Sequence, residues 1–294
     1  MKTSEKPQII YIAGYGRSGS TLLSLLLNSV PDIVNIGEVN YLYRTNHDEL
    51  PELWKKLKTE TLEALDDDIP QEMAKKRISS IRWCFMKKKL GAKLFKKLWF
   101  HPVDSIATEF GVDTLVDASK STYGSFTRPI YYKKTGYNIK VIHLIRNPHG
   151  VMKSYKKGRN VSNSPVLAPA KTGGALRGLL SWFITNTLTS LVYPFHVKRK
   201  NIFVLNYDNL IADFDNQMTQ LFQFLEIALP PQLLEDEIVL QEDISFSGNR
   251  LRLQKTITIR ENKVTKGKGI VTFLGSIFNG VYKLIEPRYV IKKN

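Results

Sequence analysis

A glycine-rich segment near the amino terminus has the residue types and spacing of a phosphate-binding loop. Residues 14–21 read GYGRSGST, and the glycines at positions 14 and 19 have the G-x-x-x-x-G spacing of a P-loop. The lysine that should follow is replaced by Ser20. Backbone N–H groups of such a loop, together with the start of the next helix, attract anions. We expect an anion site formed by Gly16, Arg17, Ser18, Gly19, Ser20 and Thr21, against the alternative of a tight turn without a ligand.

A second cationic position follows a later strand-like run. Val141–Ile145 is apolar and ends in Arg146, where an NTP hydrolase would place a carboxylate for Mg²⁺. Arginine binds phosphate bidentately, and Ser154, two helical turns further on, can add a hydroxyl. An ordinary surface ion pair is the alternative for Arg146. Two anion sites on successive turns of one parallel sheet suit a ligand with two separated anionic groups.

These segments resemble those of PAPS-dependent sulfotransferases, particularly the carbohydrate and tyrosylprotein branches and their bacterial relatives. GRSGSTLL is similar to the family's 5′-phosphosulfate loop, and VIHLIRNPHGVMKSY to the segment whose Arg and Ser bind the 3′-phosphate. Weaker similarities are VDASKS with Lys120, NIGE with Glu38, and SGNRLR. The matches follow the family's order over about residues 8–260. The resemblance implies PAPS as co-substrate, 3′-phosphoadenosine 5′-phosphate (PAP) as product, no metal, and a covering loop that contributes Gly248, Asn249 and Arg250.

Sulfuryl transfer to an alcohol needs a base for the hydroxyl proton and positive charge at the leaving phosphate. Glu38 is the preferred base, because it follows Gly37 in a loop after an apolar run; a solvated loop carboxylate is the alternative. Asp32, its nearest rival, is expected to mark a turn. Lys120, mainly on the resemblance, and Arg17 would stabilise the leaving group. His143 lies within VIHLI and is interpreted as a core histidine.

The pattern of apolar runs predicts the elements that position these residues. Strand-like runs are expected at 8–13, 113–117, 140–145 and 201–206, with helices near 20–29, 121–134, 148–157, 174–195, 208–225 and 270–285. Alternating strands and helices predict an α/β fold with a central parallel sheet flanked by helices. We expect one P-loop-like domain over residues 1–294, with a helical insertion at 48–100 and a long functional loop at 245–269.

The composition of the chain indicates which classes of partner it can bind. The chain has 294 residues, 43 Lys and Arg against 27 Asp and Glu, and a formal net charge of +16, which favours an anionic partner. One cysteine, Cys84, and no visible targeting segment favour the cytoplasm. The stretch Met73–Phe100 is basic and contains interleaved aromatic residues. This composition suits an acceptor that is a glycan, a glycolipid or another amphiphilic molecule at a membrane surface. The alternative is a pair of helices whose aromatic side chains pack inward.

Two other classes of function compete with sulfuryl transfer. A P-loop kinase with an aberrant lysine predicts Mg²⁺-dependent ATP binding. A basic nucleic-acid or membrane-surface binder explains the charge of Met73–Phe100 but not the loop or Arg146, so no nucleic-acid partner is expected. The sequence leaves the acceptor and the oligomeric state open.

Overall fold

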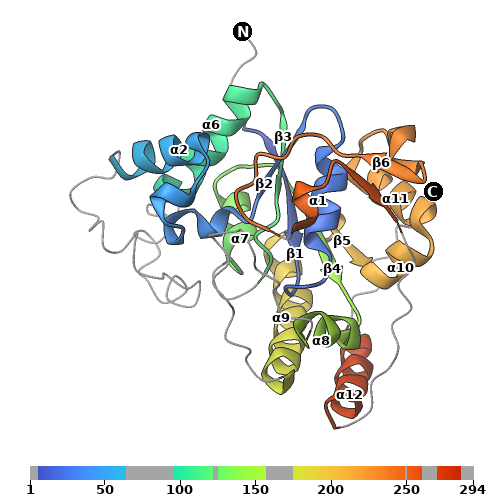
Figure 1. Ribbon diagram of the computed structural model, residues 1–294. Helices are drawn as coiled ribbons and strands as arrows, with labels where there is room; N and C mark the ends of the chain where they lie inside the picture. Colours follow the sequence, from blue (N-terminus) through green and yellow to red (C-terminus); the bar gives the residue numbers. More distant parts are fainter. Residues whose placement is uncertain are drawn as a thin grey trace.

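The computed structural model describes residues 6–63, 96–121, 125–156, 175–248, 250–259 and 270–285. Its centre is a five-stranded parallel sheet with the strand order β2-β3-β1-β4-β5 (Figure 1). The strands are β1 (Gln8–Ala13), β2 (Ile33–Gly37), β3 (Thr114–Asp117), β4 (Ile139–Ile145) and β5 (Ile202–Asn206). The predicted α/β fold with a central parallel sheet is therefore confirmed. Because all five strands are parallel, their carboxyl ends lie along one edge.

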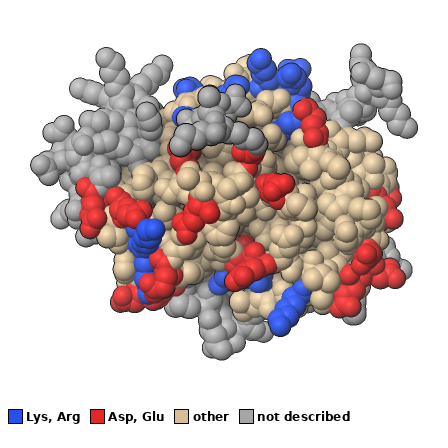
Figure 2. All heavy atoms as spheres, turned by 90° about the horizontal axis from the view of Figure 1, so that it is seen from above, with Lys and Arg blue, Asp and Glu red and all other residues tan. Residues whose placement is uncertain are grey.

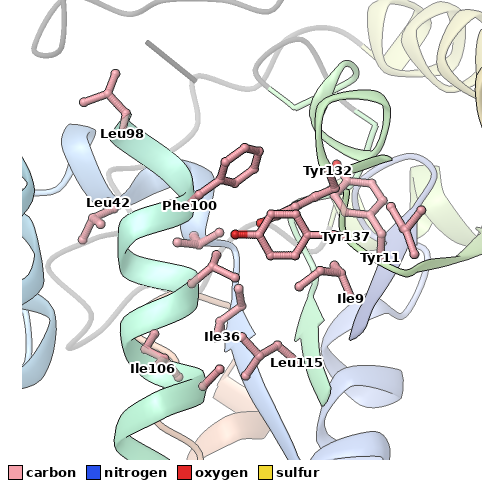
Figure 3. Close-up of a cluster of buried hydrophobic side chains, with 14 of the residues drawn as sticks. Ile9, Tyr11, Ile36, Leu42, Leu98, Phe100, Ile106, Leu115, Tyr132 and Tyr137 are labelled. Carbon is pink, nitrogen blue, oxygen red and sulfur yellow. The ribbon is translucent and has the colours of Figure 1, made fainter. Parts of the chain in front are cut away.

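Side chains of each strand alternate between two cores, one on each face of the sheet. Ile9 and Tyr11 of β1 belong to one cluster, and Ile10 and Ile12 to the other; all four are fully buried. Figure 3 shows the first cluster, where Phe100 packs against tyrosines 132 and 137. Burial on both faces explains why the strands read as continuous apolar runs.

Helices cover both faces and extend past one end of the sheet. They are α1 (Ser20–Asn28), α2 (Glu52–Glu63), α6 (His101–Phe110), α7 (Arg128–Lys134), α8 (Pro148–Lys156), α9 (Ala175–His196), α10 (Tyr207–Ala212), α11 (Phe214–Leu225) and α12 (Ile270–Ile285). Short helical turns are η1 (Val39–Arg44), η2 (His47–Glu49), η3 (Lys96–Phe100), η4 (Arg199–Asn201), η5 (Pro231–Leu234) and η6 (Arg250–Leu253). A small antiparallel pair joins β6 (Glu237–Val239) to β7 (Thr256–Thr258).

The structure differs from the expected elements in four places. Residues 33–37 form an edge strand that the sequence analysis treated only as an apolar run. The helix expected from residue 121 begins at Arg128, next to Pro129. The helix expected at 208–225 is two helices, because Asp213 leaves helical geometry at φ −141° and ψ 63°. The expected long loop at 245–269 contains η6 and β7.

The expected insertion is described only at its two ends. Residues 64–95, which include lysines 87, 88 and 89, lie outside the described residues. At the far end, Leu98 and Phe100 are buried, and Trp99 lies under the Arg128 guanidinium, 4.6 Å from Cζ to the ring centroid. This end of the aromatic stretch packs inward. Among the described helices, none combines the length and apolarity needed to cross a membrane.

Candidate functional site

The sheet brings the predicted site residues to one edge. The phosphate loop follows β1, Glu38 follows β2, Lys120 follows β3, and Arg146 follows β4. Tyr207 follows β5 in the same way. All five strand ends thus place candidate residues along one edge of the sheet, which is where parallel α/β sheets bind ligands.

The phosphate loop is held in a conformation that only glycine tolerates at two positions. Gly14 has a φ of +114°, and a Cβ there would lie 2.2 Å from the Leu144 carbonyl oxygen; Gly19 has a φ of +99°, and its Cβ would lie 2.2 Å from the Tyr207 ring. Gly19 precedes α1 and no side chain caps the helix, so its first N–H groups face the loop. Ser18 is buried, and its Oγ has no hydrogen-bond partner among the described residues. These features fit an anion.

Arg146 lies against this loop. Its Nη1 donates to the Arg17 carbonyl oxygen at 3.3 Å, and its Cζ stands 4.4 Å from the centroid of the Tyr207 ring. Its Nε is buried and has no hydrogen-bond partner in the described part of the chain. Gly150 makes room for this side chain, since a Cβ there would lie 2.8 Å from that Nε. The guanidinium is therefore positioned next to the loop with donor capacity left for an anion.

Neighbouring elements fix the turn that carries Arg146. Trp182 of α9 donates its Nε1–H to the Arg146 carbonyl oxygen at 3.0 Å, and the Asn147 N–H donates to Asp208 Oδ2 at 2.8 Å. Ser154 lies on α8 and is half-buried, two turns after Arg146. The backbone of this turn is thus tied to both α10 and α9.

Two of the three predicted catalytic side chains, those of Glu38 and Lys120, form an ion pair. Lys120 Nζ lies 2.5 Å from Glu38 Oε1, and the two side chains are 13% and 15% exposed. They come from neighbouring strands, because Gly37 of β2 pairs with Asp117 of β3. A carboxylate and an ammonium group therefore meet beside the phosphate loop with limited access to solvent.

The backbone at Lys120 is fixed to the phosphate loop. Lys120 has a φ of +65°, its N–H donates to the Ile12 carbonyl oxygen at 3.2 Å, and its carbonyl oxygen accepts from the Tyr11 hydroxyl. Ser121 and Gly14 exchange two hydrogen bonds, of 3.0 and 3.1 Å. The left-handed residue is thus held from two sides, and its side chain is directed by the same backbone that shapes the loop.

A buried cluster of charged and polar side chains stabilises the segment between β3 and Lys120. Arg128 donates to Asp117 Oδ2 from both Nε and Nη2, at 3.0 and 2.7 Å, and Tyr132 donates to the same oxygen. Asp117 Oδ1 accepts the N–H of Ser119 at 2.9 Å. Burial is the largest single effect and lowers the pKa of Arg128, but the Asp117 carboxylate, together with Tyr132 and Tyr11, outweighs it, so the pKa of Arg128 is raised. The cluster therefore links the end of β3 to α7.

The late segment packs over Glu38. Ser247 donates its hydroxyl to the Glu38 carbonyl oxygen at 3.4 Å, and a Cβ on Gly37 would lie 2.5 Å from Ser245 Cβ. A Cβ on Gly248 would lie 3.7 Å from Thr21 Oγ1, so this glycine approaches the phosphate loop. Asn249 and the side chain of Arg250 lie outside the described residues.

His143 and Asn186 form a buried pair away from solvent. Nε2 of His143 lies 3.2 Å from Asn186 Oδ1, and both residues are at most 1% exposed. Burial lowers the pKa of His143 to about 4, against a weaker opposing effect of the Asn186 hydrogen bond. His143 is thus a neutral, hydrogen-bonded histidine of the core at neutral pH.

The site can bind anions and move a proton with its own side chains. The loop and Arg146 supply donors and positive charge, while Glu38 supplies a carboxylate. Among the described residues no group of three or more His, Cys, Asp and Glu side chains could hold a metal ion.

Sequence reasoning missed two contributors to this edge. Tyr207 contacts both Gly19 and Arg146, and its only sequence signal is its place directly after a strand. The Asp117–Arg128–Tyr132 cluster gave no signal, because Arg128 stands eleven residues from Asp117 and no short motif joins them.

Comparisons with known proteins agree with this geometry. A sequence profile described as "Sulfotransferase family" matches residues 7–231. A search of curated proteins gave no match. Among solved structures, the sulfotransferase domain of the Synechococcus PCC 7002 olefin synthase has a TM-score of 0.54 at 18% identity, covering 96% of this chain and 98% of that one. The sulfotransferase domain from the curacin biosynthetic pathway has a TM-score of 0.49 at 19% identity, covering 99% and 95%. The first of these likenesses shows a shared fold.

Proposed function

The chain belongs to the sulfotransferase family, and we propose that it transfers a sulfuryl group from PAPS to a hydroxyl group of an acceptor. One observation carries the choice of donor: Arg146, with a buried and unpartnered Nε, lies against the phosphate loop. A ligand with a phosphosulfate at one end and a separate phosphate suits two anion sites at this spacing along the sheet edge.

In this proposal two sets of hydrogen-bond donors bind the two anionic ends of the nucleotide. The 5′-phosphosulfate would lie against the loop, contacted by Gly16, Arg17, Ser18, Gly19, Ser20 and Thr21. The 3′-phosphate would lie against Arg146, with Ser154 as a second donor and the segment of Gly248, Asn249 and Arg250 covering the nucleotide. The Tyr207 ring under Arg146 holds the guanidinium plane in place.

The catalytic step needs a proton acceptor and a balance of charge. When bound, PAPS supplies the sulfuryl group, whose bond to the bridging phosphate oxygen breaks as a bond to the acceptor oxygen forms. Glu38 takes the proton that the acceptor hydroxyl loses. Lys120 and Arg17 stabilise the negative charge that builds on the released phosphate. Atoms and charge balance without a metal, and the products are a sulfate ester and PAP.

The acceptor is proposed only as a class. The site is directed at a hydroxyl group, and the basic and aromatic stretch Met73–Phe100 favours an amphiphilic alcohol, a glycan or a glycolipid. Replacing lysines 87, 88 and 89 with glutamine should then raise the acceptor KM and leave nucleotide affinity unchanged. An unchanged acceptor KM would contradict this part of the proposal.

Ligand-induced stabilisation tests the donor. The melting temperature should rise with PAP in the absence of metal and stay unchanged with ATP and Mg²⁺. A sulfate-transfer assay with PAPS and a pooled alcohol library then identifies the acceptor. Stabilisation by ATP and Mg²⁺ alone would contradict the proposal and favour the kinase alternative.

A further inference from the structure

Two helices, α9 and α12, carry exposed apolar stripes. On α9 the stripe has a spacing of three or four residues and runs over Leu176, Leu180, Ile184, Leu188, Leu191 and Phe195, which are 41–85% exposed. On α12 it runs over Phe273, Ile277, Val281 and Leu284, which are 41–87% exposed. Single exposed apolar side chains are ordinary, but continuous stripes of this length mark a contact surface.

The two stripes lie on one side of the helix pair. The contacts advance together along both helices, from Phe183 stacked on Phe278 to the Ser190 hydroxyl 2.9 Å from that of Tyr282, so the helices run in the same direction. With 3.6 residues per turn, the stripe on each helix is rotated by about a quarter to a third of a turn from the side that contacts the other helix. The rotation has opposite senses on α9 and α12. Because the two helices are parallel and face each other, both stripes then point to the same side of the helix pair. The α9 stripe spans about 29 Å.

The two helices that carry the stripes contain basic residues but no acidic ones. Neither α9 nor α12 contains Asp or Glu, and Phe195 is followed by exposed Lys198, Arg199 and Lys200. Figure 1 places α8, α9 and α12 together below the sheet, and Figure 2 shows that the opposite end carries Asp and Glu side chains together with some Lys and Arg. An apolar face whose two helices carry no acidic residue, and which is bordered at the end of α9 by cations, complements an anionic lipid surface.

A second copy of the chain is a poorer occupant. In a two-fold dimer the same face meets itself, so Lys198, Arg199 and Lys200 would approach their own copies with no acidic partner from α9 or α12. We propose that the α9–α12 face docks on the surface of an anionic lipid bilayer, with its apolar stripes in the headgroup boundary. This inference goes beyond sulfuryl transfer and does not depend on it.

Vesicle binding of the full chain tests the proposal. Co-sedimentation with phosphatidylglycerol vesicles should be strong, should weaken with added salt, and should exceed that with phosphatidylcholine vesicles. The double variant Phe195→Ser/Leu284→Ser should lower the partition coefficient at least about tenfold, because each side chain loses its apolar burial in the bilayer. Val239→Ser/Leu253→Ser is the matched control, since these residues are 69% and 72% exposed on β6 and η6.

A charge-reversal variant tests the electrostatic contribution to vesicle binding. Arg199→Glu/Lys200→Glu should abolish the preference for phosphatidylglycerol, while Lys134→Glu/Lys255→Glu, exposed on other elements, should keep it. PAP binding by every variant reports folding and tests the proposed function separately. Three outcomes would overturn the inference: no binding of the wild-type chain to anionic vesicles, equal losses in the control variants, or a concentration-dependent dimer that Phe195→Ser/Leu284→Ser dissociates.

Discussion

Lys120 Nζ and Glu38 Oε1 form a 2.5 Å ion pair that joins the ends of two neighbouring strands. The backbone conformation orients both side chains. Lys120 has a left-handed φ, and Glu38 follows Gly37, which also has a positive φ. An acceptor hydroxyl that reaches Glu38 must therefore compete with Lys120 for the carboxylate.

Removing the carboxylate should remove the base. We expect Glu38→Gln to lower kcat by about a hundredfold or more in the sulfate-transfer assay, with PAP affinity intact, because the amide keeps the shape of the side chain and accepts no proton. Asp32→Asn is the matched control, since Asp32 is exposed in a turn with a φ of +62°. Near-normal turnover of Glu38→Gln would place the base elsewhere.

The ion pair predicts that the two residues act together. Lys120→Ala should also lower kcat, because charge on the leaving phosphate loses its stabilisation. In a double-mutant cycle, the Glu38→Gln/Lys120→Ala enzyme should lose much less than the product of the two single losses. Multiplicative losses would show that the 2.5 Å contact does not couple them during turnover.

Arg146 should discriminate nucleotides by their 3′-phosphate. Arg146→Ala should weaken PAP binding by about 2–3 kcal/mol, through loss of a charge-assisted contact, and adenosine 5′-phosphate binding far less. Isothermal titration with both nucleotides measures the difference. Equal losses for both would remove Arg146 from the 3′-phosphate site.

Gly150 offers a second test of the same contact. In Gly150→Ala the new methyl group would lie 2.8 Å from Arg146 Nε, so the guanidinium must shift and PAP affinity should fall selectively, by less than in Arg146→Ala. Gly280→Ala is the control, because this helical glycine has open space around it. If both glycine variants bind PAP like the wild type, the position of Arg146 does not limit binding.

Much of the fold could be predicted because buried strands and packed helices have recognisable patterns of apolar residues. β1 and α12 have the expected bounds, since a strand buried on both faces reads as an apolar run and a packed helix keeps its 3.6-residue period. The break at Asp213 was not predicted. It lies at a single residue, Asp213, which ends α10 and starts α11, and the apolar period of the sequence does not register a change at one position.

The positions of the candidate site residues could be predicted where they follow from local spacing, and could not where they depend on contacts across the fold. The loop at 14–21 and Arg146 each follow a strand, so their shared edge followed from a parallel sheet. The Lys120–Glu38 pair needs β2 beside β3, and the strand order is not written in any short segment. The support of Lys120 by Tyr11 likewise joins residues 109 positions apart.

The buried His143 makes stability fall in mild acid. Its pKa in the folded chain is about 4, below the ordinary 6.5, so as the pH drops through 6.5 only the unfolded chain takes up this proton. The free energy of unfolding should therefore fall between pH 6.5 and 4, by up to about 3 kcal/mol from this residue. His143→Gln removes the proton site and should flatten that part of the urea-denaturation profile, whereas His196→Gln, at an exposed position, should not. An unchanged slope in His143→Gln would show that His143 does not stay neutral in the folded chain.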